Sequence, residues 1–164
     1  SSDYLDRYAD SIRQYLGAKT LCSLLTGVLV LLLLTIVGVK EAFLWGFLAF
    51  LLNYVPTIGS IIASVPALIM ALIQFGVPAT VSVAIAYVVI NVSVSNFLEP
   101  LLMGEKMGLS PLAIILSLVF WGWMYGPIGM LLSVPLTMTI KIALETSENT
   151  RWVGMLLDAG KKKA

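Results

Sequence analysis

Charged residues divide the chain into long apolar stretches that are typical of membrane helices. Residues 20–39, between Lys19 and Lys40, carry no charge. As a helix they would span about 30 Å, the thickness of the hydrocarbon core of a bilayer. Charged residues are also absent from 42–98 and from 107–140. This pattern predicts an all-α polytopic membrane protein in which residues 20–39 form the first transmembrane helix.

Residues 1–19 show a different, amphipathic pattern. Apolar side chains recur four residues apart on one face of the expected helix, and acidic and arginine side chains occupy the other face. The apolar face consists of Tyr4, Leu5, Tyr8, Ile12, Tyr15 and Leu16. Tyrosine is enriched where a membrane meets water, so we expect residues 1–19 to form an amphipathic juxtamembrane helix.

The stretches 42–75 and 111–140 are each interrupted near the middle by a similar pattern. The first contains Asn53-Tyr54-Val55-Pro56-Thr57-Ile58-Gly59 and then Ser64-Val65-Pro66; the second contains Tyr125-Gly126-Pro127-Ile128-Gly129 and then Ser133-Val134-Pro135. A continuous helix over 42–75 would be roughly 50 Å long, which is too long for a bilayer. We therefore expect two helical hairpins broken at Pro and Gly. They are predicted to be re-entrant, with two short spanning arms as the alternative.

A second transmembrane helix is predicted over residues 79–98, opened by Pro78 at a helix-start position. Its polar residues form one stripe: Tyr87, Asn91, Ser95 and Glu99 follow each other four residues apart, and Asn96 lies one step round the helix. Polar groups in a bilayer need partners, so the stripe should face the protein interior. Hydrogen bonding between helices and the lining of a solute pathway explain it equally well.

The order of elements predicts an inverted repeat. Residues 20–75 and 76–141 would each contain a spanning helix and a broken hairpin, and 142–164 would form a cytoplasmic or interfacial tail. With re-entrant hairpins, Lys40 lies alone on one side of the membrane and the other nine of the ten Lys and Arg lie opposite. The positive-inside rule then places both ends of this segment in the cytoplasm. Interrupted segments at matching positions in two halves are a pointer to a transporter binding site.

Composition narrows the classes of function. The mean hydropathy is +0.98, and 59% of the residues are hydrophobic, which excludes an ordinary soluble domain. The sequence has no histidine and a single cysteine, Cys22, so it offers no histidine-dependent nucleophilic site and no intrachain disulfide. Walker-type and GxGxxG patterns are absent as well. We therefore expect a protein that is not an enzyme, with no cofactor, no metal site and no nucleic-acid partner.

Several short strings resemble the autoinducer-2 exporter (PerM-like permease) family. They are found at residues 43–46, 52–60, 96–100, 103–104, 108–110, 120–123 and 126–135. The chain looks like the C-terminal half of a family member, so we expect a piece of a longer protein. The resemblance implies a bacterial inner-membrane homo-oligomer that exports the quorum-sensing signal autoinducer-2. Some relatives resemble monovalent cation/proton antiporters.

The residues and the resemblance together favour a transporter of a small neutral polar solute. Autoinducer-2 is an uncharged, hydroxyl-rich furanone, so its recognition needs hydrogen-bond donors and acceptors rather than fixed charge. We expect its path to run between the two hairpin tips. The candidate pathway residues are Asn53, Tyr54, Pro56, Thr57, Gly59, Ser60, Asn91, Ser95, Asn96, Glu99, Tyr125, Pro127 and Gly129.

Two other functions remain open. A cation/proton antiporter would need a titratable carboxylate in the membrane, for which Glu99 is the candidate. A membrane scaffold without transport is the third possibility, and the two matched breaks argue against it.

Overall fold

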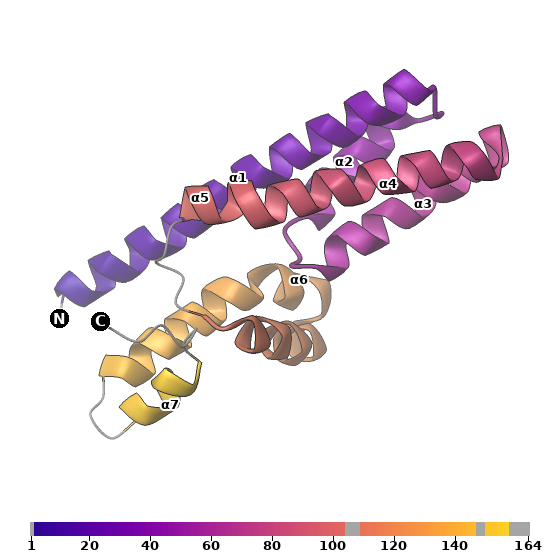
Figure 1. Cartoon of the computed structure of the whole chain (residues 1–164). Coiled ribbons are helices and arrows are strands. Elements are labelled where there is room, and N and C mark those ends of the chain that lie inside the picture. Colours follow the sequence, from indigo (N-terminus) through magenta and orange to yellow (C-terminus); the bar gives the residue numbers. More distant parts are fainter. Residues whose placement is uncertain (1, 104–108, 147–149, 158–164) are drawn as a thin grey trace. The chain divides into compact units, whose positions relative to one another are not determined.

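The computed structural model describes residues 2–103, 109–146 and 150–157, and these residues are almost entirely helical (Figure 1). The helices are α1 (Ser2–Val37), α2 (Ala42–Leu52), α3 (Ile58–Phe75), α4 (Val77–Ser93), the π-helix η1 (Val94–Leu98), α5 (Glu99–Met103), α6 (Pro111–Thr146) and α7 (Arg151–Leu156). One compact unit comprises Leu16–Leu102, and the two ends of the chain form the other. Each unit is described by itself.

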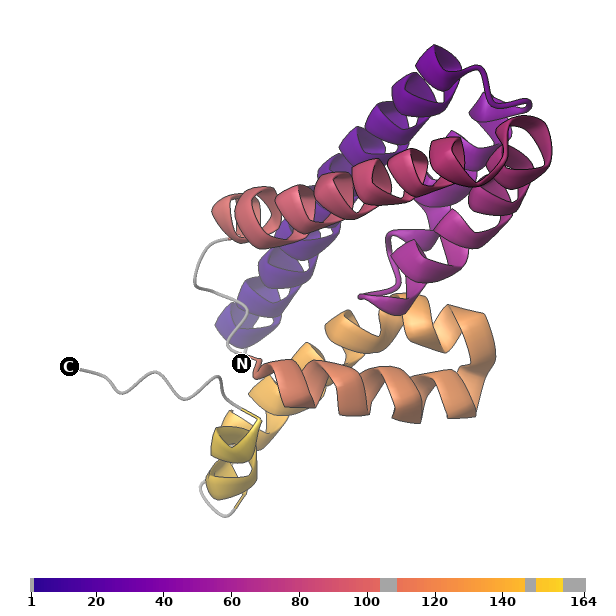
Figure 2. The same cartoon turned by 45° about the vertical axis from the view of Figure 1, so that its right-hand side comes forward.

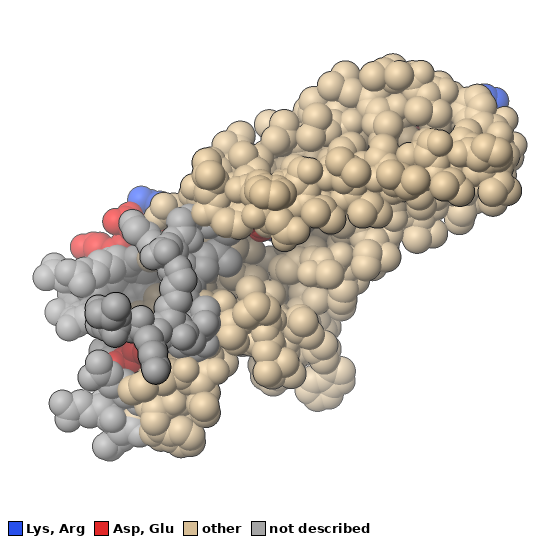
Figure 3. Space-filling view, in the orientation of Figure 1, with Lys and Arg blue, Asp and Glu red and all other residues tan. Residues whose placement is uncertain are grey.

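Four segments are long and apolar enough to cross a membrane: Ala9–Val37, Ile58–Phe75, Val77–Leu102 and Pro111–Glu145. The prediction of an all-α polytopic membrane protein is therefore confirmed. Many large apolar side chains, including Ile36, Phe43 and Ile73, lie exposed on these helices. The face shown in Figure 3 is uncharged along the helices of the Leu16–Leu102 unit, and charged side chains lie towards their ends. Such a surface suits lipid rather than water.

The amphipathic segment and the first apolar segment form one continuous helix, α1, rather than two. The helix ends at Gly38, which has a φ of 87°. The Val39 N–H donates to the Leu34 carbonyl at 2.9 Å, and the Gly38 N–H donates to Thr35 at 3.2 Å. This left-handed glycine cap closes a helix because glycine has no Cβ to clash. The side chains of Tyr4, Leu5 and Tyr8 lie outside the described residues.

The first interrupted stretch forms a hairpin in which α2 packs against α3 and α3 packs against α4 (Figures 1 and 2). Both ends of this hairpin lie at the same end of the unit, because the Lys40 N–H donates to the Gln74 side chain at 2.8 Å. Gly76 then reverses the chain at a φ of 77°. As predicted, a proline stands in the first turn of α4.

The core of the Leu16–Leu102 unit consists of small side chains on α3 packed between larger ones. Ala63, Ala67 and Ala71 are buried, and they pack with Leu34 and Val83. Small residues allow membrane helices to approach closely, where dispersion contacts replace the hydrophobic effect as the source of stability. Close packing here leaves the polar residues of α3 and α4 to meet nearer the hairpin tip.

The second interrupted stretch, α6, also reverses direction. Gly126 has non-helical backbone angles (φ 64°, ψ −145°). The two arms then lie against each other, since the Trp121 indole N–H donates to the Thr137 hydroxyl at 3.0 Å. The second arm continues to Thr146 and is followed by the short helix α7, within the predicted tail. Lys106 and residues 161–163 lie outside the described residues.

Candidate functional site

The tip of the first hairpin is tied to α1 by two side-chain hydrogen bonds. The Asn53 amide donates to the Ser23 hydroxyl at 3.2 Å, and the Tyr54 hydroxyl donates to the Thr20 hydroxyl at 2.7 Å. Thr20 and Ser23 lie three residues apart and therefore on one face of α1. Asn53 and Ser23 are buried. The tip thus lies beside the first turn of the apolar part of α1.

The turn at this tip holds a residue other than glycine at positive φ. Thr57 has φ 61° and ψ −57°. The Ile58 N–H donates to the Pro56 carbonyl at 2.6 Å, two residues back. These features define a γ-turn of the rare, strained kind. Residues held in such conformations cost about 1–3 kcal/mol and cluster at functional sites.

Gly59 closes the hairpin by close backbone contact. A Cβ atom at this position would overlap the carbonyl oxygen of Leu52, at the end of α2. The same arrangement recurs in α6, where a Cβ atom at Gly129 would overlap the carbonyl oxygen of Trp121. The two breaks that resemble each other in sequence therefore place their last glycine in the same way. They differ in the turn itself, which uses Thr57 after the proline in one case and Gly126 before it in the other.

In each Ser-Val-Pro string, the serine hydroxyl donates a hydrogen bond to the backbone carbonyl three residues earlier. The Ser64 hydroxyl donates to the Ile61 carbonyl at 2.8 Å, and the Ser133 hydroxyl donates to the Met130 carbonyl at 2.9 Å. A proline inside a helix removes a backbone donor and leaves carbonyl oxygens unsatisfied. The serine hydroxyls bond Ile61 and Met130, one residue before the carbonyls of Ile62 and Leu131 that lose their donor to the prolines, so these bonds lie beside the lost ones and do not replace them.

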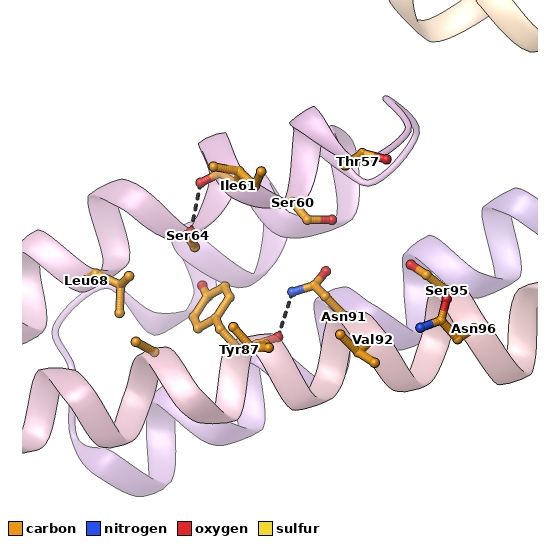
Figure 4. A pocket seen from close by; sticks show the side chains of 12 residues that line it. Thr57, Ser60, Ile61, Ser64, Leu68, Tyr87, Asn91, Val92, Ser95 and Asn96 are labelled. Atoms are coloured by element: carbon orange, nitrogen blue, oxygen red, sulfur yellow. Dashed lines mark hydrogen bonds between the residues drawn. The ribbon is translucent and has the colours of Figure 1, made fainter. Parts of the chain in front are cut away.

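A groove of about 360 Å³ lies between α3 and α4, and hydroxyl and amide side chains line it (Figure 4). Its polar lining residues are Thr57, Ser60, Ser64, Tyr87, Asn91, Ser95 and Asn96; its apolar ones include Leu68, Ala84 and Val88. No Asp, Glu, Lys or Arg is among them. The groove runs from the hairpin tip to Leu68. Beyond that point the interface is closed by Ala71 and Val83, which are buried.

A π-helix, η1, follows α4 and forms the end of the groove nearest the hairpin tip. In η1, the Glu99 N–H donates to the Val94 carbonyl five residues back rather than four. Each residue of such a turn advances less far round the axis. Ser95 and Asn96 both line the groove, as do the consecutive pairs Tyr87–Val88 and Asn91–Val92 in the regular part of α4. Single π-turns inside helices occur frequently at functional sites.

Glu99 lies next to the groove but does not line it. Its Oε1 lies 2.6 Å from the ammonium nitrogen of Lys19 on α1. The Lys19 side chain is 6% exposed and that of Glu99 is 20% exposed. Ionisable groups this well buried in a membrane helix are costly without a partner. The ion pair therefore joins α1 to the end of α4 near the hairpin tip.

The predicted pathway residues separate into groups. Thr57, Ser60, Asn91, Ser95 and Asn96 share the groove; Asn53 and Tyr54 contact α1 instead. Pro56 and Gly59 shape the turn. In the second hairpin, Gly129 is buried by the contact described above, whereas Tyr125 and Pro127 are exposed. The Tyr125 ring stacks on Trp121 at 5.9 Å between centroids. The two hairpins belong to different compact units. A site between their tips therefore stays a prediction.

Of the polar groove residues, sequence reasoning missed Tyr87 as a pathway residue, whereas Ser64 was among the hydroxyl groups expected to bind the solute. Tyr87 belonged to the predicted polar stripe but was not counted as a pathway residue. Ser64 lies one turn after Ser60 on α3, and this spacing places both hydroxyls on one face. Both residues line the groove.

Comparison with known proteins agrees with the resemblance found in the sequence. A family model described as "AI-2E family transporter" matches residues 1–149. A "Putative transport protein" of Haemophilus influenzae is 51% identical over 154 residues, which cover 94% of this chain and 44% of that protein. "AI-2 transport protein TqsA" of Escherichia coli is 45% identical over 153 residues, covering 93% of this chain and 44% of the relative.

A third relative gives the same picture. The protein named YhhT of Escherichia coli is 45% identical over 160 residues, covering 98% of this chain and 46% of the relative. The chain thus spans less than half the length of these three relatives. The family match covers most of the chain, and the relatives share its helical sequence almost from end to end. The chain belongs to the AI-2E family of transporters, which are multi-pass bacterial membrane proteins and not enzymes.

Proposed function

We propose that the protein exports a small, neutral, hydroxyl-rich solute through the groove between α3 and α4, and that this solute is autoinducer-2. The observation that carries the proposal is the lining of the groove: hydroxyl and amide groups, with no side chain of fixed charge. Such groups bind an uncharged polar solute by hydrogen bonds and offer an ion no countercharge. The relative named "AI-2 transport protein" supports this choice of solute.

The size of the groove fits the proposed solute. Ligand sites for small molecules have volumes of roughly 300–1,000 Å³, and the groove has about 360 Å³. The half of the groove nearest the hairpin tip is polar, at Thr57 and Asn96, and the half farthest from the tip is apolar, at Leu68 and Ala84. A solute with a hydroxylated face and a hydrocarbon face would match both halves.

The groove also has a direction. One end of the groove lies at the hairpin tip, close to the start of α5, where Glu99 pairs with Lys19. The distribution of positive charge predicts that this end faces the cytoplasm. A groove whose polar end lies towards the cytoplasm, and whose other end is closed by Ala71 and Val83, would load a solute from within the cell, as export requires.

We propose the finer topology on the same basis. The α2–α3 hairpin would enter the membrane from the Lys40 side, and the α6 hairpin would enter from the opposite side as an inverted repeat. Both ends of the segment would then lie in the cytoplasm. The hairpin tip is hydrogen-bonded to Thr20 and Ser23. Because these residues lie at the start of the apolar part of α1, the hairpin would run alongside most of that part. The homo-oligomer implied by the resemblance stays a prediction.

The geometry gives less support to a cation/proton antiporter. Glu99 is the carboxylate that the antiporter hypothesis requires, and Lys19 already engages it. A cation would have to displace this ammonium group before it could bind. A scaffold function without transport does not explain why a polar groove lies between two membrane helices.

The test is efflux of labelled autoinducer-2 from proteoliposomes that contain the full-length protein. We expect efflux without a sodium or pH gradient, and we expect Asn91→Leu to reduce it. Val89→Leu is the matched control, because Val89 lies on the same helix and is exposed outside the groove. Absence of autoinducer-2 efflux, with proton movement when sodium is added, would replace the exporter by the antiporter.

A further inference from the structure

Tyr87 presents a buried polar atom that the fold does not use. The side chain is 2% exposed, and its ring packs in the core with Ala63, Ala67 and Val83. Its hydroxyl is the one buried side-chain polar atom without a hydrogen-bond partner among the described residues. Figure 4 shows the ring between α3 and α4, with the hydroxyl end towards Ser64.

Packing explains the ring of Tyr87 but not its hydroxyl. A phenylalanine would fill the same space, and it would avoid the loss incurred when a buried hydroxyl leaves water without gaining a partner. The hydroxyl is also closed to bulk water, since its own surface is buried. A buried donor of this kind calls for a partner that reaches it from the adjoining groove.

The neighbouring polar groups show what such a partner needs. The Asn91 amide N–H donates to the Tyr87 carbonyl at 2.8 Å, and the amide oxygen of Asn91 turns towards α3 (Figure 4). The Ser64 hydroxyl donates to Ile61. The groove therefore offers a donor at Tyr87 and an acceptor at Asn91, one helical turn apart on the same face of α4.

We propose that Tyr87 is the specificity-determining residue of the groove, where its hydroxyl donates to an acceptor oxygen of the solute while Asn91 accepts from a solute hydroxyl. The solute class is a small polyhydroxylated ring that carries an acceptor oxygen and a hydroxyl group. This inference rests on the proposed function. Because the Tyr87 hydroxyl is covered, solute binding has to shift the side chains that cover it.

The proposal predicts discrimination between solutes that differ only in a hydroxyl group. A site that pairs a buried donor with a solute oxygen rejects an analogue lacking that oxygen, whereas an apolar pocket barely distinguishes the two. In the full-length wild-type protein, efflux of autoinducer-2 should therefore exceed efflux of a deoxy analogue of the same ring. In Tyr87→Phe the ratio of the two rates should fall by roughly tenfold or more.

Stability separates this role from a structural one. Tyr87→Phe should leave the melting temperature of the protein unchanged or raise it, because it removes an unpaired buried hydroxyl. Thr80→Val is the matched control on α4: the Thr80 hydroxyl donates to Gly76 at 2.9 Å and lies outside the groove. The control should retain the wild-type ratio of efflux rates, whatever it does to the melting temperature.

Two results would overturn the inference, and they are distinguishable. If the wild-type protein exports autoinducer-2 but Tyr87→Phe keeps the full discrimination, the hydroxyl does not select the solute and the proposed function survives. If the wild-type protein exports neither compound, the proposed function fails and the inference fails with it. A lower melting temperature in Tyr87→Phe with unchanged discrimination would assign the hydroxyl to folding.

Discussion

The ion pair between Lys19 and Glu99 makes a quantitative prediction about stability. At an effective dielectric constant of about 20, two charges 2.6 Å apart attract each other by roughly 6 kcal/mol. Much of this attraction offsets the cost of removing both groups from water. What remains measurable is the penalty for removing one partner and leaving the other buried and uncompensated.

The two single substitutions should differ because the partners are buried to different degrees. Glu99→Gln strands the Lys19 ammonium, which is 6% exposed, and should cost about 3 kcal/mol of unfolding free energy. Lys19→Met strands the more exposed Glu99, which keeps contact with water, and should cost about 1–2 kcal/mol. The double variant strands no charge and should cost no more than about 2 kcal/mol. The coupling energy is then about 2–3 kcal/mol.

The assay is reversible unfolding of the full-length protein in mixed detergent micelles, followed by circular dichroism, for the wild type and the three variants. Lys40→Met with Glu41→Gln is the control cycle, because both side chains are exposed and should not couple. Additivity of Lys19→Met and Glu99→Gln to within about 0.5 kcal/mol would refute the reasoning, since it would show that the pair behaves as a solvated surface contact.

Four further substitutions test the hairpin tips by the same unfolding measurement, with Gly17→Ala in α1 as a control. Gly59→Ala and Gly129→Ala should each lower the free energy of unfolding by about 1–3 kcal/mol, because the added methyl group meets a backbone carbonyl. At Gly17 a methyl group has open space, so Gly17→Ala should raise the free energy of unfolding by up to about 1 kcal/mol. Equal effects at all three glycines would contradict this explanation. Thr57→Gly should stabilise the protein by about 1 kcal/mol, because it relieves the positive φ, whereas a loss of stability would show that the turn is unstrained. Asn53→Leu should cost about 1–3 kcal/mol through the lost buried bond, and unaltered stability would exclude a structural role for Asn53.

The sequence was sufficient for the elements that the bilayer itself dictates. A charge-free stretch of membrane length predicts a helix wherever it occurs, so residues 20–39 and 79–98 were recognisable from their composition. Pro and Gly at positions 56 and 59 marked a chain reversal because both residue types are frequent at turns, although Gly59 itself lies in the first turn of α3. Pro78 marked a helix start for the same kind of local reason.

The partners of polar side chains could not be predicted in this way. Asn53 and Tyr54 looked like pathway residues because they are polar and adjoin a break, yet their hydrogen bonds go to α1. Glu99 finds its partner Lys19 80 residues away in sequence. Contacts of this range depend on how the helices pack, which single-residue patterns do not encode.

The backbone irregularities were equally hidden. No residue type specifies a π-helix, so the π-turn at Val94–Leu98 could not be predicted, although the polar stripe did predict that Ser95 and Asn96 lie near the pathway. The positive φ of Thr57 runs against the ordinary preference of a β-branched residue. Both features adjoin the groove, where departures from local preference are expected if the site is functional.

The central claim is that the α3–α4 groove is a water-filled solute path, and thiol accessibility tests it most directly. In a full-length protein with Cys22 replaced by alanine, single cysteines are introduced at Ser64, in the groove, and at Ile85, on the exposed apolar face of α4. Only a hydrated thiol forms the reactive thiolate. The account predicts that Ser64→Cys reacts with a small polar thiol reagent and is protected by autoinducer-2, whereas Ile85→Cys stays unreactive. Failure of Ser64→Cys to react, or reaction that autoinducer-2 does not slow, would contradict it.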